Sequence, residues 1–380
     1  MNRPLPLSFS FFSVLLLLVT LLLLTSSQTQ ADPAASQQNT MSLEEIREEN
    51  AKVLTDVQAL IDKKEYAEAV SLLKPLAAKE QPEAMYVLGY LTHEGQGVKA
   101  SPRTAAELYR KAALKGDIRA QTAWGKALAA GDGVKRNYRE AATWFRKAAD
   151  EGVAIAQYNL GYLYAHGRGV PKNEATAVEW FTKAAQQGLS DAQYSLGWIY
   201  LNSQGELQND TQAVHWLEQA AEQEHPKAQN NLAYMYAEGK GVAVSTEKAI
   251  YWYTHAAEQG YAVAQYNLGV MYEQGRGIAQ DYEQAVNWYR KAAEQNEPAA
   301  QYCLGVMYDQ GTGVPANHQE AVQWYRLAAQ NGDKDAQKEL RALERSRPRP
   351  EPSKKEKEKD KKDGKSQKKK DSQQKKSDKQ

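Results

Sequence analysis

Residues 264–295 read AQYNLGVMYEQGRGIAQDYEQAVNWYRKAAEQ, and the same pattern restarts at residue 300 as AQYCLGVMYDQGTGVPANHQEAVQWYRLAAQ. A chain that repeats itself every 36 residues predicts a stack of similar units, each too small to bury its own apolar surface. Alignment of the chain at this period gives a column of eight alanines: Ala84, Ala120, Ala156, Ala192, Ala228, Ala264, Ala300 and Ala336.

The first half of each copy predicts a helix. In the quoted copy, Ala264 is followed by Leu268 and then by Tyr272, which places one apolar stripe at helical spacing. Gly269 stands inside this helix, where glycine costs about 1 kcal/mol relative to alanine. We therefore expect a second helix to approach closely at the glycine, with the tryptophan of the copy as its neighbour. The first glycine of the G-x-G motif that follows suits the left-handed residue at which a helix ends.

The second half of each copy predicts another helix. Seven residues that favour helix N-caps form one column before an alanine-rich segment: Ser101, Asn137, Asn173, Asn209, Ser245, Asp281 and Asn317. A tryptophan column follows: Trp144, Trp180, Trp216, Trp252, Trp288 and Trp324. For the quoted copy we expect Ala285, Trp288, Ala292 and Ala293 to form the buried face. The whole pattern predicts an all-α protein of helix-turn-helix repeats.

The ends of the chain differ from its middle. Seven copies occupy residues 82–333, preceded by a degenerate capping repeat at 43–81 and followed by a single closing helix at 334–345. A polar linker at 32–42 precedes this body. The tail at 346–380 is rich in lysine and has no apolar content to offset the entropy of ordering, so its composition predicts disorder. Residues 345–380 hold 16 Lys+Arg and 7 Asp+Glu, a net charge of +9.

The N-terminus has the pattern of a secretory signal peptide. Arg3 precedes an apolar run from Phe11 to Leu24, and Thr29-Gln30-Ala31 resembles a cleavage site. We expect cleavage after Ala31 and a periplasmic or secreted protein. The alternative is an uncleaved anchor, because the apolar run approaches the length that spans a bilayer. No second apolar run exists, so we expect no membrane span after cleavage.

The sequence offers no catalytic constellation. It contains no metalloprotease, nucleophile-elbow, P-loop or paired-cysteine motif, and its six histidines fall in unrelated columns. Cys303 is the single cysteine, so the chain has no internal disulfide. It stands where other copies carry asparagine or serine, which favours a tolerated small side chain over a reactive thiol. We expect a non-enzymatic protein without metal or cofactor.

The recurring A-x-x-x-L-G-x-x-Y, G-x-G, A-x-x-W and A-A motifs resemble the Sel-one-like repeat (SLR) family, relatives of the tetratricopeptide repeats. The stretch AQYNLGYLYAHGRGVPKNEATAVEWFTKAAQQG at 156–188 is similar to the whole family pattern. The resemblance implies a right-handed α-solenoid whose first helices line a concave face, and members that act as adaptors or scaffolds, often in bacterial envelopes. The fourth copy departs from the pattern, because Ser203 and Glu206 replace the usual Gly and Val, so we expect its turn to be altered.

The remaining candidate site is the predicted concave face. Tyrosine, tryptophan and asparagine side chains project from one side of the first helices, and such residues suit the binding of a protein or an extended peptide. The candidate residues are Tyr90, Tyr158, Asn159, Tyr162, Tyr194, Trp198, Asn231, Tyr234, Tyr266 and Asn267. For the first tyrosine column, packing between repeats is an equally strong interpretation.

Two functions remain open at the level of sequence. The first is an exported scaffold of the bacterial envelope that binds a protein or peptide partner. The alternative is a cell-wall or polysaccharide-associated protein that uses the same aromatic side chains and its basic tail, which could attach to anionic envelope polymers. The tail has no aromatic residue to stack on bases, so we expect no specific nucleic-acid binding.

Overall fold

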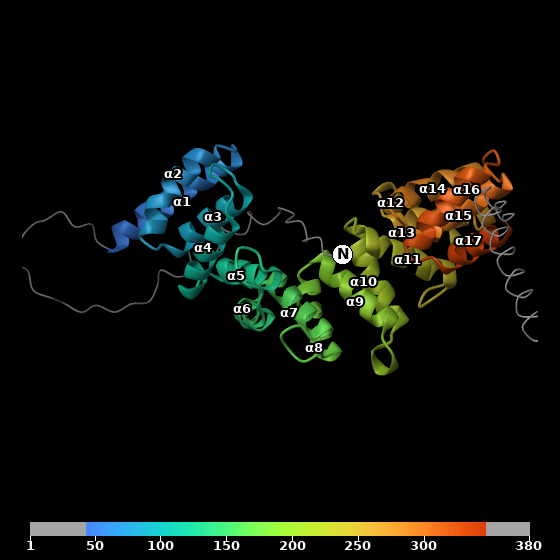
Figure 1. The fold of residues 1–380 in the computed structure, drawn as a ribbon. Coiled ribbons are helices and arrows are strands. Elements are labelled where there is room, and N and C mark those ends of the chain that lie inside the picture. Colours follow the sequence, from blue (N-terminus) through green and yellow to red (C-terminus); the bar gives the residue numbers. More distant parts are fainter. Residues whose placement is uncertain (1–42, 347–380) are drawn as a thin grey trace, which may run out of the picture. The chain divides into compact units, whose positions relative to one another are not determined.

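The computed structural model describes residues 43–346 and consists there of α-helices and one short 3₁₀-helix, without strands (Figure 1). The signal peptide, linker and lysine-rich tail that the sequence predicts lie outside the described residues. The chain divides into two compact units, Met1–Gln223 and Glu224–Gln380. In each unit successive helices pack in pairs, which confirms the predicted all-α repeat class.

The first unit contains ten of the described α-helices. Their bounds are α1 Leu43–Asp62, α2 Tyr66–Ala78, α3 Pro82–Glu94, α4 Pro102–Leu114, α5 Ile118–Ala130, α6 Tyr138–Asp150, α7 Ala154–His166, α8 Glu174–Gln186, α9 Ser190–Asn202 and α10 Asp210–Glu222, with the 3₁₀-helix η2 at Gly205–Leu207. The second unit contains α11 Pro226–Glu238, α12 Thr246–Glu258, α13 Ala262–Gln274, α14 Tyr282–Glu294, α15 Pro298–Gln310, α16 His318–Gln330 and α17 Lys334–Ser346.

The second helix of every copy begins where the sequence predicts. All seven residues of the predicted N-cap column have extended backbone, and each side-chain oxygen accepts a hydrogen bond from the backbone N–H three residues later. Asn173, for example, accepts from Thr176 N at 3.0 Å. Each cap satisfies one of the N–H groups that a helix leaves free at its start, so the column fixes the register of all seven helices.

The glycine inside the first helix packs against an aromatic side chain in most copies, and against Leu217 in the fourth, but this side chain is not the tryptophan that we expected. A Cβ on Gly269 would lie 2.7 Å from the ring of Tyr289, and one on Gly161 would lie 2.9 Å from the ring of Phe181. Both rings belong to the residue that follows the tryptophan. The prediction of the neighbour was therefore wrong by one position, because the second helix is rotated so that the later side chain points at the glycine.

The buried face of the second helix shifts in the same way in the quoted copy, although Trp144 and Trp180 of earlier copies are buried as the tryptophan column predicts. Ala285 and Ala292 are fully buried as predicted, but Trp288 is only partly buried, and Tyr289 takes its place in the core. The ammonium of Lys291 lies 3.9 Å from the centre of the Trp288 ring. An aromatic ring of this size removes enough apolar area from water to contribute about 4–6 kcal/mol as an upper bound, so Tyr289 is a principal core residue.

The turn of the fourth copy is altered, as the sequence predicts. Other first helices end at a left-handed glycine such as Gly167, with a φ of 63°. Ser203 stands at that position with a φ of −70° and a ψ of 167°, because a residue with a Cβ avoids the left-handed conformation. The chain then forms the 3₁₀-helix η2 before Asn209 caps the next α-helix.

The first helices of residues 43–346 also differ from those of the regular copies. The first helix, α1, has 20 residues, whereas each helix of the regular copies has 13. In α2 the core residue is again one position later than the tryptophan column predicts, since Leu73 is fully buried and Leu72 is 39% exposed. Within residues 43–346, no helix combines the length and the apolar character that crossing a membrane requires.

Candidate functional site

The first tyrosine column packs within its own copy. The ring of Tyr158 lies 5.6 Å from that of Phe181, and the ring of Tyr266 lies 5.8 Å from that of Tyr289. In both pairs, the first helix supplies the tyrosine and the second helix supplies the core ring next to the glycine. These tyrosines therefore join the two helices of one copy, and Tyr158 also has a hydrogen bond with Ser195 of the next copy, so packing between repeats contributes as well.

The second aromatic column lies nearer to the solvent. Tyr162 stacks on His166 with 4.1 Å between ring centres, and the guanidinium of Arg168 lies 5.4 Å from the same tyrosine ring. Trp198 is 50% exposed, whereas the other candidate residues of the first unit are partly buried. Such an exposed indole combines a large apolar area with one N–H donor, which suits it to contact a partner.

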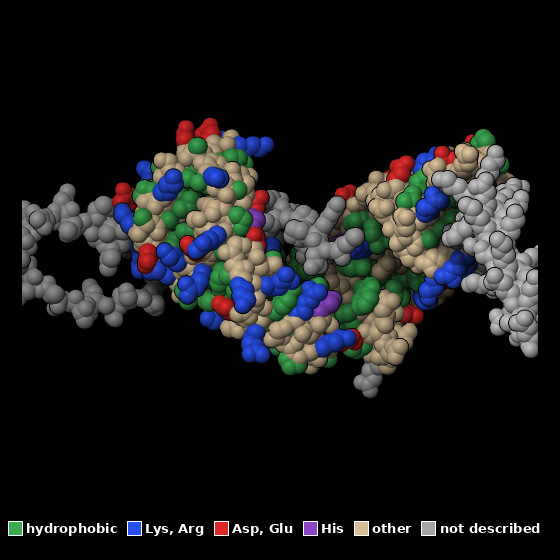
Figure 2. Space-filling model, viewed as in Figure 1, with side chains coloured by type: hydrophobic (Ala, Val, Ile, Leu, Met, Phe, Trp, Pro, Cys, Tyr) green, Lys and Arg blue, Asp and Glu red, His purple; other side chains and the backbone are tan. Residues whose placement is uncertain are grey.

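Tyr158 of α7 lies close to several residues of α9. Burial raises the pKa of Tyr158, the negative charge of Asp191 raises it further, and a hydrogen bond with Ser195 opposes the shift. Tyr162 and Tyr194 also act on the same phenol. We call Tyr158, Tyr162, Tyr194 and Trp198 the aromatic strip. Figure 2 shows that apolar, lysine and arginine side chains intermingle over the first unit.

Tyr90 lies on α3, nearer to the N-terminus of the first unit. Partial burial and the negative charge of Glu94 raise its pKa to about 12. The phenol therefore stays protonated and neutral near neutral pH. Tyr86 and Tyr66 are close enough to act on the same group, so Tyr90 belongs to a cluster of tyrosines near the N-terminal end.

Two of the candidate residues of the second unit are asparagines in a hydrogen-bonded chain. Asn267 donates to the side-chain oxygen of Asn230 at 2.9 Å, and Asn230 donates to that of Asn231 at 3.3 Å. Tyr234 is 38% exposed, with the ammonium of Lys240 4.9 Å from its ring centre. Asn231 and Asn267 each already form a side-chain hydrogen bond with Asn230, and Tyr234 is the exposed aromatic candidate of this unit.

In the first unit, Asn159 also uses its side chain locally. Its amide donates to the backbone oxygen of Ile155 at 2.7 Å, one turn earlier in α7. Cys303, the residue at this column in a later copy, is partly buried. Burial and the charge of Glu273 raise the pKa of its thiol to about 12, so the thiol is protonated at neutral pH and is a poor nucleophile.

Sequence reasoning missed a ladder of glutamines beside the alanine column. Gln157 donates to the backbone oxygen of Ala149 in the preceding copy at 3.1 Å, and it accepts from Gln187 at 2.8 Å. The same two bonds recur at Gln193 and Gln265 in the first and second units. Each glutamine thus ties three helices together. The available signal was the pairing of Gln with a Gln or Asn 30 residues later.

The ladder is interrupted in one copy. Gln121 has Glu151 at the position 30 residues later, and a carboxylate has no N–H to donate. In the described part of the chain, the side-chain oxygen of Gln121 is buried and has no hydrogen-bond partner. Among the same residues, no group of three or more His, Cys, Asp or Glu side chains could hold a metal ion.

Comparison with known proteins identifies the repeated unit. The family model described as the Sel1 repeat matches seven consecutive segments, at residues 82–117, 118–153, 154–189, 190–225, 226–261, 262–297 and 298–333. These segments comprise most of the chain and follow the 36-residue period of the sequence. A search of curated proteins gives no match.

Two solved structures are similar over most of the chain. A protective antigen of uropathogenic Escherichia coli strains that displays an SLR fold is 33% identical, with a TM-score of 0.66, and the similarity covers 80% of this chain and 67% of that one. A Sel1 repeat protein from Oxalobacter formigenes is 30% identical, with a TM-score of 0.62, covering 84% of this chain and 98% of that one.

Proposed function

This chain belongs to the Sel1 repeat family, whose members are generally non-catalytic scaffolds for protein–protein interaction, and on that premise we propose that it is an exported scaffold that binds an extended peptide along its first helices. The proposed binding surface is the aromatic strip on α7 and α9. The proposed location is the bacterial cell envelope.

One observation carries the binding surface, namely the exposure of Trp198. The side chain sits one residue after the helix glycine, on a helix that buries Leu196 and Ile199 on its other face. A half-exposed tryptophan beside partly buried tyrosines offers a rigid area that loses little side-chain entropy on binding. Tyr162, held by Arg168, extends this area along α7.

Replacement of Tyr162 and Trp198 by alanine tests this surface. A photoreactive residue at position 198 first identifies the cross-linked partner in cells, and the purified partner is then titrated against the wild type and the double variant. We expect the double variant to lose at least about 100-fold in affinity, as for two hot-spot side chains, with an unchanged helical circular dichroism spectrum. Unchanged affinity would refute the assignment of the aromatic strip.

A matched control is available on a second helix. Tyr251 on α12 is 54% exposed, so its replacement by alanine removes a comparable exposed ring from the other type of helix. We expect Tyr251→Ala to bind the partner like the wild type. An equal loss in this control would mean that exposed aromatic side chains act non-specifically.

Support for export comes from the N-terminal sequence pattern and from the similarity to a bacterial protective antigen. If residues 1–31 are a cleaved signal peptide, the mature protein begins at Asp32. Mass spectrometry of the protein recovered from fractionated cells tests both points. An intact N-terminus in the membrane fraction would favour the alternative of an uncleaved anchor.

One observation favours a second function, binding to a wall polysaccharide. The ring of Tyr251 lies 4.9 Å from Trp252 and 4.4 Å from His255, which forms an exposed aromatic group on α12. Aromatic faces of this kind stack on sugar rings. Sedimentation with purified peptidoglycan, with and without residues 345–380, tests this function and the role of the basic tail. Loss of sedimentation in Tyr251→Ala, with peptide binding retained, would separate the two functions.

A further inference from the structure

Lys126 places a charge in a column that is otherwise uncharged. The column follows the helix glycine of each copy and holds Tyr90, Lys126, Tyr162, Trp198, Tyr234, Val270 and Val306. The helix glycine of α5, Gly125, packs against Phe145. In α7, Gly161 packs against Phe181 in the same way. The two first helices are therefore rotated alike, and Lys126 projects from α5 on the side from which the aromatic strip projects from α7.

Lys126 is partly buried and has no countercharge. Within residues 43–346 it forms no hydrogen bond and no ion pair. Burial lowers the pKa of its ammonium, and no carboxylate opposes this shift. In the same part of the chain, the buried side-chain nitrogen and oxygen atoms without a partner belong to Gln121, Trp124 and Trp324, so the Lys126 nitrogen is within reach of solvent. A partly buried charge without a partner costs free energy, which an incoming anion would recover.

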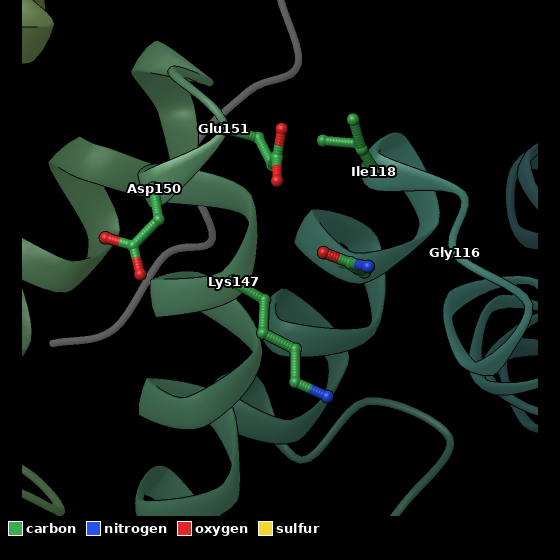
Figure 3. Close-up of a pocket in the computed structure, with 6 residues that line it drawn as sticks. Gly116, Ile118, Lys147, Asp150 and Glu151 are labelled. Atoms are coloured by element: carbon green, nitrogen blue, oxygen red, sulfur yellow. The ribbon is translucent and has the colours of Figure 1, made fainter.

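Two carboxylates lie beside the start of α5. Asp150 and Glu151, at the end of α6, line a shallow pocket of about 530 Å³ together with Ile118 (Figure 3). Lys126 lies eight residues farther along α5, which is about 12 Å at the rise of an α-helix. Because burial alone shifts the pKa of Lys126, neither carboxylate compensates its charge.

Positive charge gathers on the first helices and turns of two neighbouring copies. Residues 118–137 hold four Lys+Arg and one Asp, a net charge of +3, and residues 154–173 hold two Lys+Arg and no Asp or Glu, a net charge of +2. The corresponding residues of the flanking copies, 82–101 and 190–209, have net charges of −1 and −2. Figure 2 shows lysine and arginine side chains over this part of the first unit. An anionic group is therefore attracted to α5 and α7.

We propose, on the basis of the proposed function, that Lys126 binds an Asp or Glu side chain of the peptide that lies on the aromatic strip. A carboxylate supplies both the missing countercharge and an acceptor for the ammonium N–H groups. First helices of successive copies are neighbours, as the hydrogen bond between Tyr158 and Ser195 shows. Neighbouring helices are about 8–10 Å apart, and an extended chain advances about 3.4 Å per residue. The acidic residue should therefore stand about three positions from the one that contacts Tyr162.

The place of Lys126 favours a single carboxylate over a polyanionic polymer. A polymer would engage the exposed basic residues of the turns, such as Lys135 and Arg136, which offer several charges that are already in water. Lys126 is one charge beside the apolar rings of the strip, so it suits a ligand that combines an acidic group with apolar side chains.

Selection of random peptides of about twelve residues, displayed and bound to the full chain, tests the proposal. We expect the wild type to enrich Asp or Glu, and Lys126→Met to lose this enrichment. Lys135→Met removes the same charge from an exposed position of the same copy and should enrich acidic residues like the wild type. Equal enrichment by all three proteins would indicate general charge attraction and would overturn the proposal, as would wild-type peptides without acidic residues.

A recovered peptide then permits a double-mutant cycle. Replacement of its acidic residue by the corresponding amide should weaken binding to the wild type and to Lys135→Met by about tenfold, as for the loss of one charge-assisted hydrogen bond. The same replacement should leave binding to Lys126→Met unchanged, and an equal loss there would overturn the proposal. Lys126→Met should keep the helical circular dichroism spectrum, because methionine replaces the apolar stem and removes an unpaired charge.

The outcomes separate the carboxylate site from the aromatic strip. Acidic peptides that need Lys126, but bind the Tyr162 and Trp198 double alanine variant like the wild type, would refute the strip and leave the carboxylate site. Peptides that lose affinity in the double variant but contain no acidic residue would refute the carboxylate site alone. A selection that recovers no peptide would refute both.

Discussion

The copies at 118–153 and 154–189 have the same backbone design, but they differ in the hydrogen bonds of the glutamine that belongs to the ladder. Phe145 and Phe181 are almost fully buried against the helix glycines of their copies, and both second helices begin at an asparagine cap. Gln157 accepts a hydrogen bond from Gln187, whereas Gln121 has Glu151 at the corresponding position, and within residues 43–346 its side-chain oxygen has no partner. The comparison shows that ring packing, caps and turns suffice to form a copy, and that the glutamine ladder adds stability and leaves room for variation.

The largest effect is expected from replacing a turn glycine that both copies share. A Cβ on Gly133 would lie 2.2 Å from the backbone oxygen of Pro102, and a Cβ on Gly169 would lie 2.4 Å from the backbone carbon of Tyr138. Both glycines also have a positive φ. Alanine at either position should lower the free energy of unfolding by about 3 kcal/mol or more, measured by urea denaturation.

Gly205 is the control for this prediction. Its φ of 73° equals that of Gly169, but a Cβ there would meet nothing within 4 Å. Gly205→Ala should therefore cost only the left-handed backbone penalty, about 1 kcal/mol. Equal losses at the two positions would show that close packing of the turn on the preceding copy contributes little.

The next largest effect should differ between the two copies, because only one of them has a complete glutamine ladder. Gln157→Leu removes one hydrogen bond from the Ala149 oxygen and one from the Gln187 amide, and should lower the free energy of unfolding by about 2 kcal/mol. Gln121→Leu removes an oxygen that has no partner in the described chain, and should change it by less than about 0.5 kcal/mol. Thermal and urea unfolding of both variants give the values. Similar losses would mean that the two glutamines contribute equally to stability.

A gain in stability is expected when the interrupted glutamine ladder is completed. Glu151→Gln supplies the amide that the copy at 154–189 already has, and should raise the free energy of unfolding by about 1 kcal/mol. The reverse change, Gln187→Glu, should lower it by a similar amount. Hydrogen exchange of the α5 and α6 amides locates the change in Glu151→Gln. A destabilised Glu151→Gln variant would contradict the role assigned to the ladder.

The smallest effect is the pH dependence of stability that the contact between the copies at 82–117 and 118–153 produces. His93 contacts Glu94 and Asp132 at 2.7 Å each. In the next pair of copies, Ala129 and Arg168 stand at the positions of His93 and Asp132. Partial burial lowers the pKa of His93, but the hydrogen bonds to the two carboxylates outweigh it and raise the pKa above the ordinary 6.5. The stabilisation is therefore full below about pH 6.5 and is lost as the pH rises through the higher folded pKa.

Comparison with His93→Gln measures this dependence. The imidazole is about one-third exposed, so we expect a difference of less than about 1 kcal/mol in the free energy of unfolding between the two proteins at pH 5.5. The difference should shrink toward pH 8.5. A difference that stays constant or grows with pH would contradict the assigned protonation of His93.

Most of the fold could be predicted from the sequence because the signal is repeated seven times. Cap residues such as Asn173 and turn glycines such as Gly167 act locally, so their types identify helix ends directly. The choice between Trp288 and Tyr289 as the core ring could not be made in this way. Both fit an apolar stripe, and their places depend on how the second helix rotates against Gly269.

The candidate site was predictable only as a set of residue types. Helical spacing places Tyr158 and Trp198 on first helices, but it does not show that Tyr158 packs on Phe181 while Trp198 remains half-exposed. The ladder of Gln157 and Gln187 was also missed, because its bonds join residues 30 positions apart and extend to the backbone of the preceding copy. Such pairs follow from the superposition of copies, which period analysis alone does not provide.

The contact between a turn glycine and the backbone of the preceding second helix has an evolutionary consequence. Within each unit, Gly133 meets Pro102, Gly169 meets Tyr138 and Gly313 meets Tyr282 through main-chain atoms. The step from one copy to the next thus depends on atoms that every residue type shares. Duplication or deletion of a whole 36-residue block preserves this step, so the gene can change the length of the protein while the side chains between the contacts diversify.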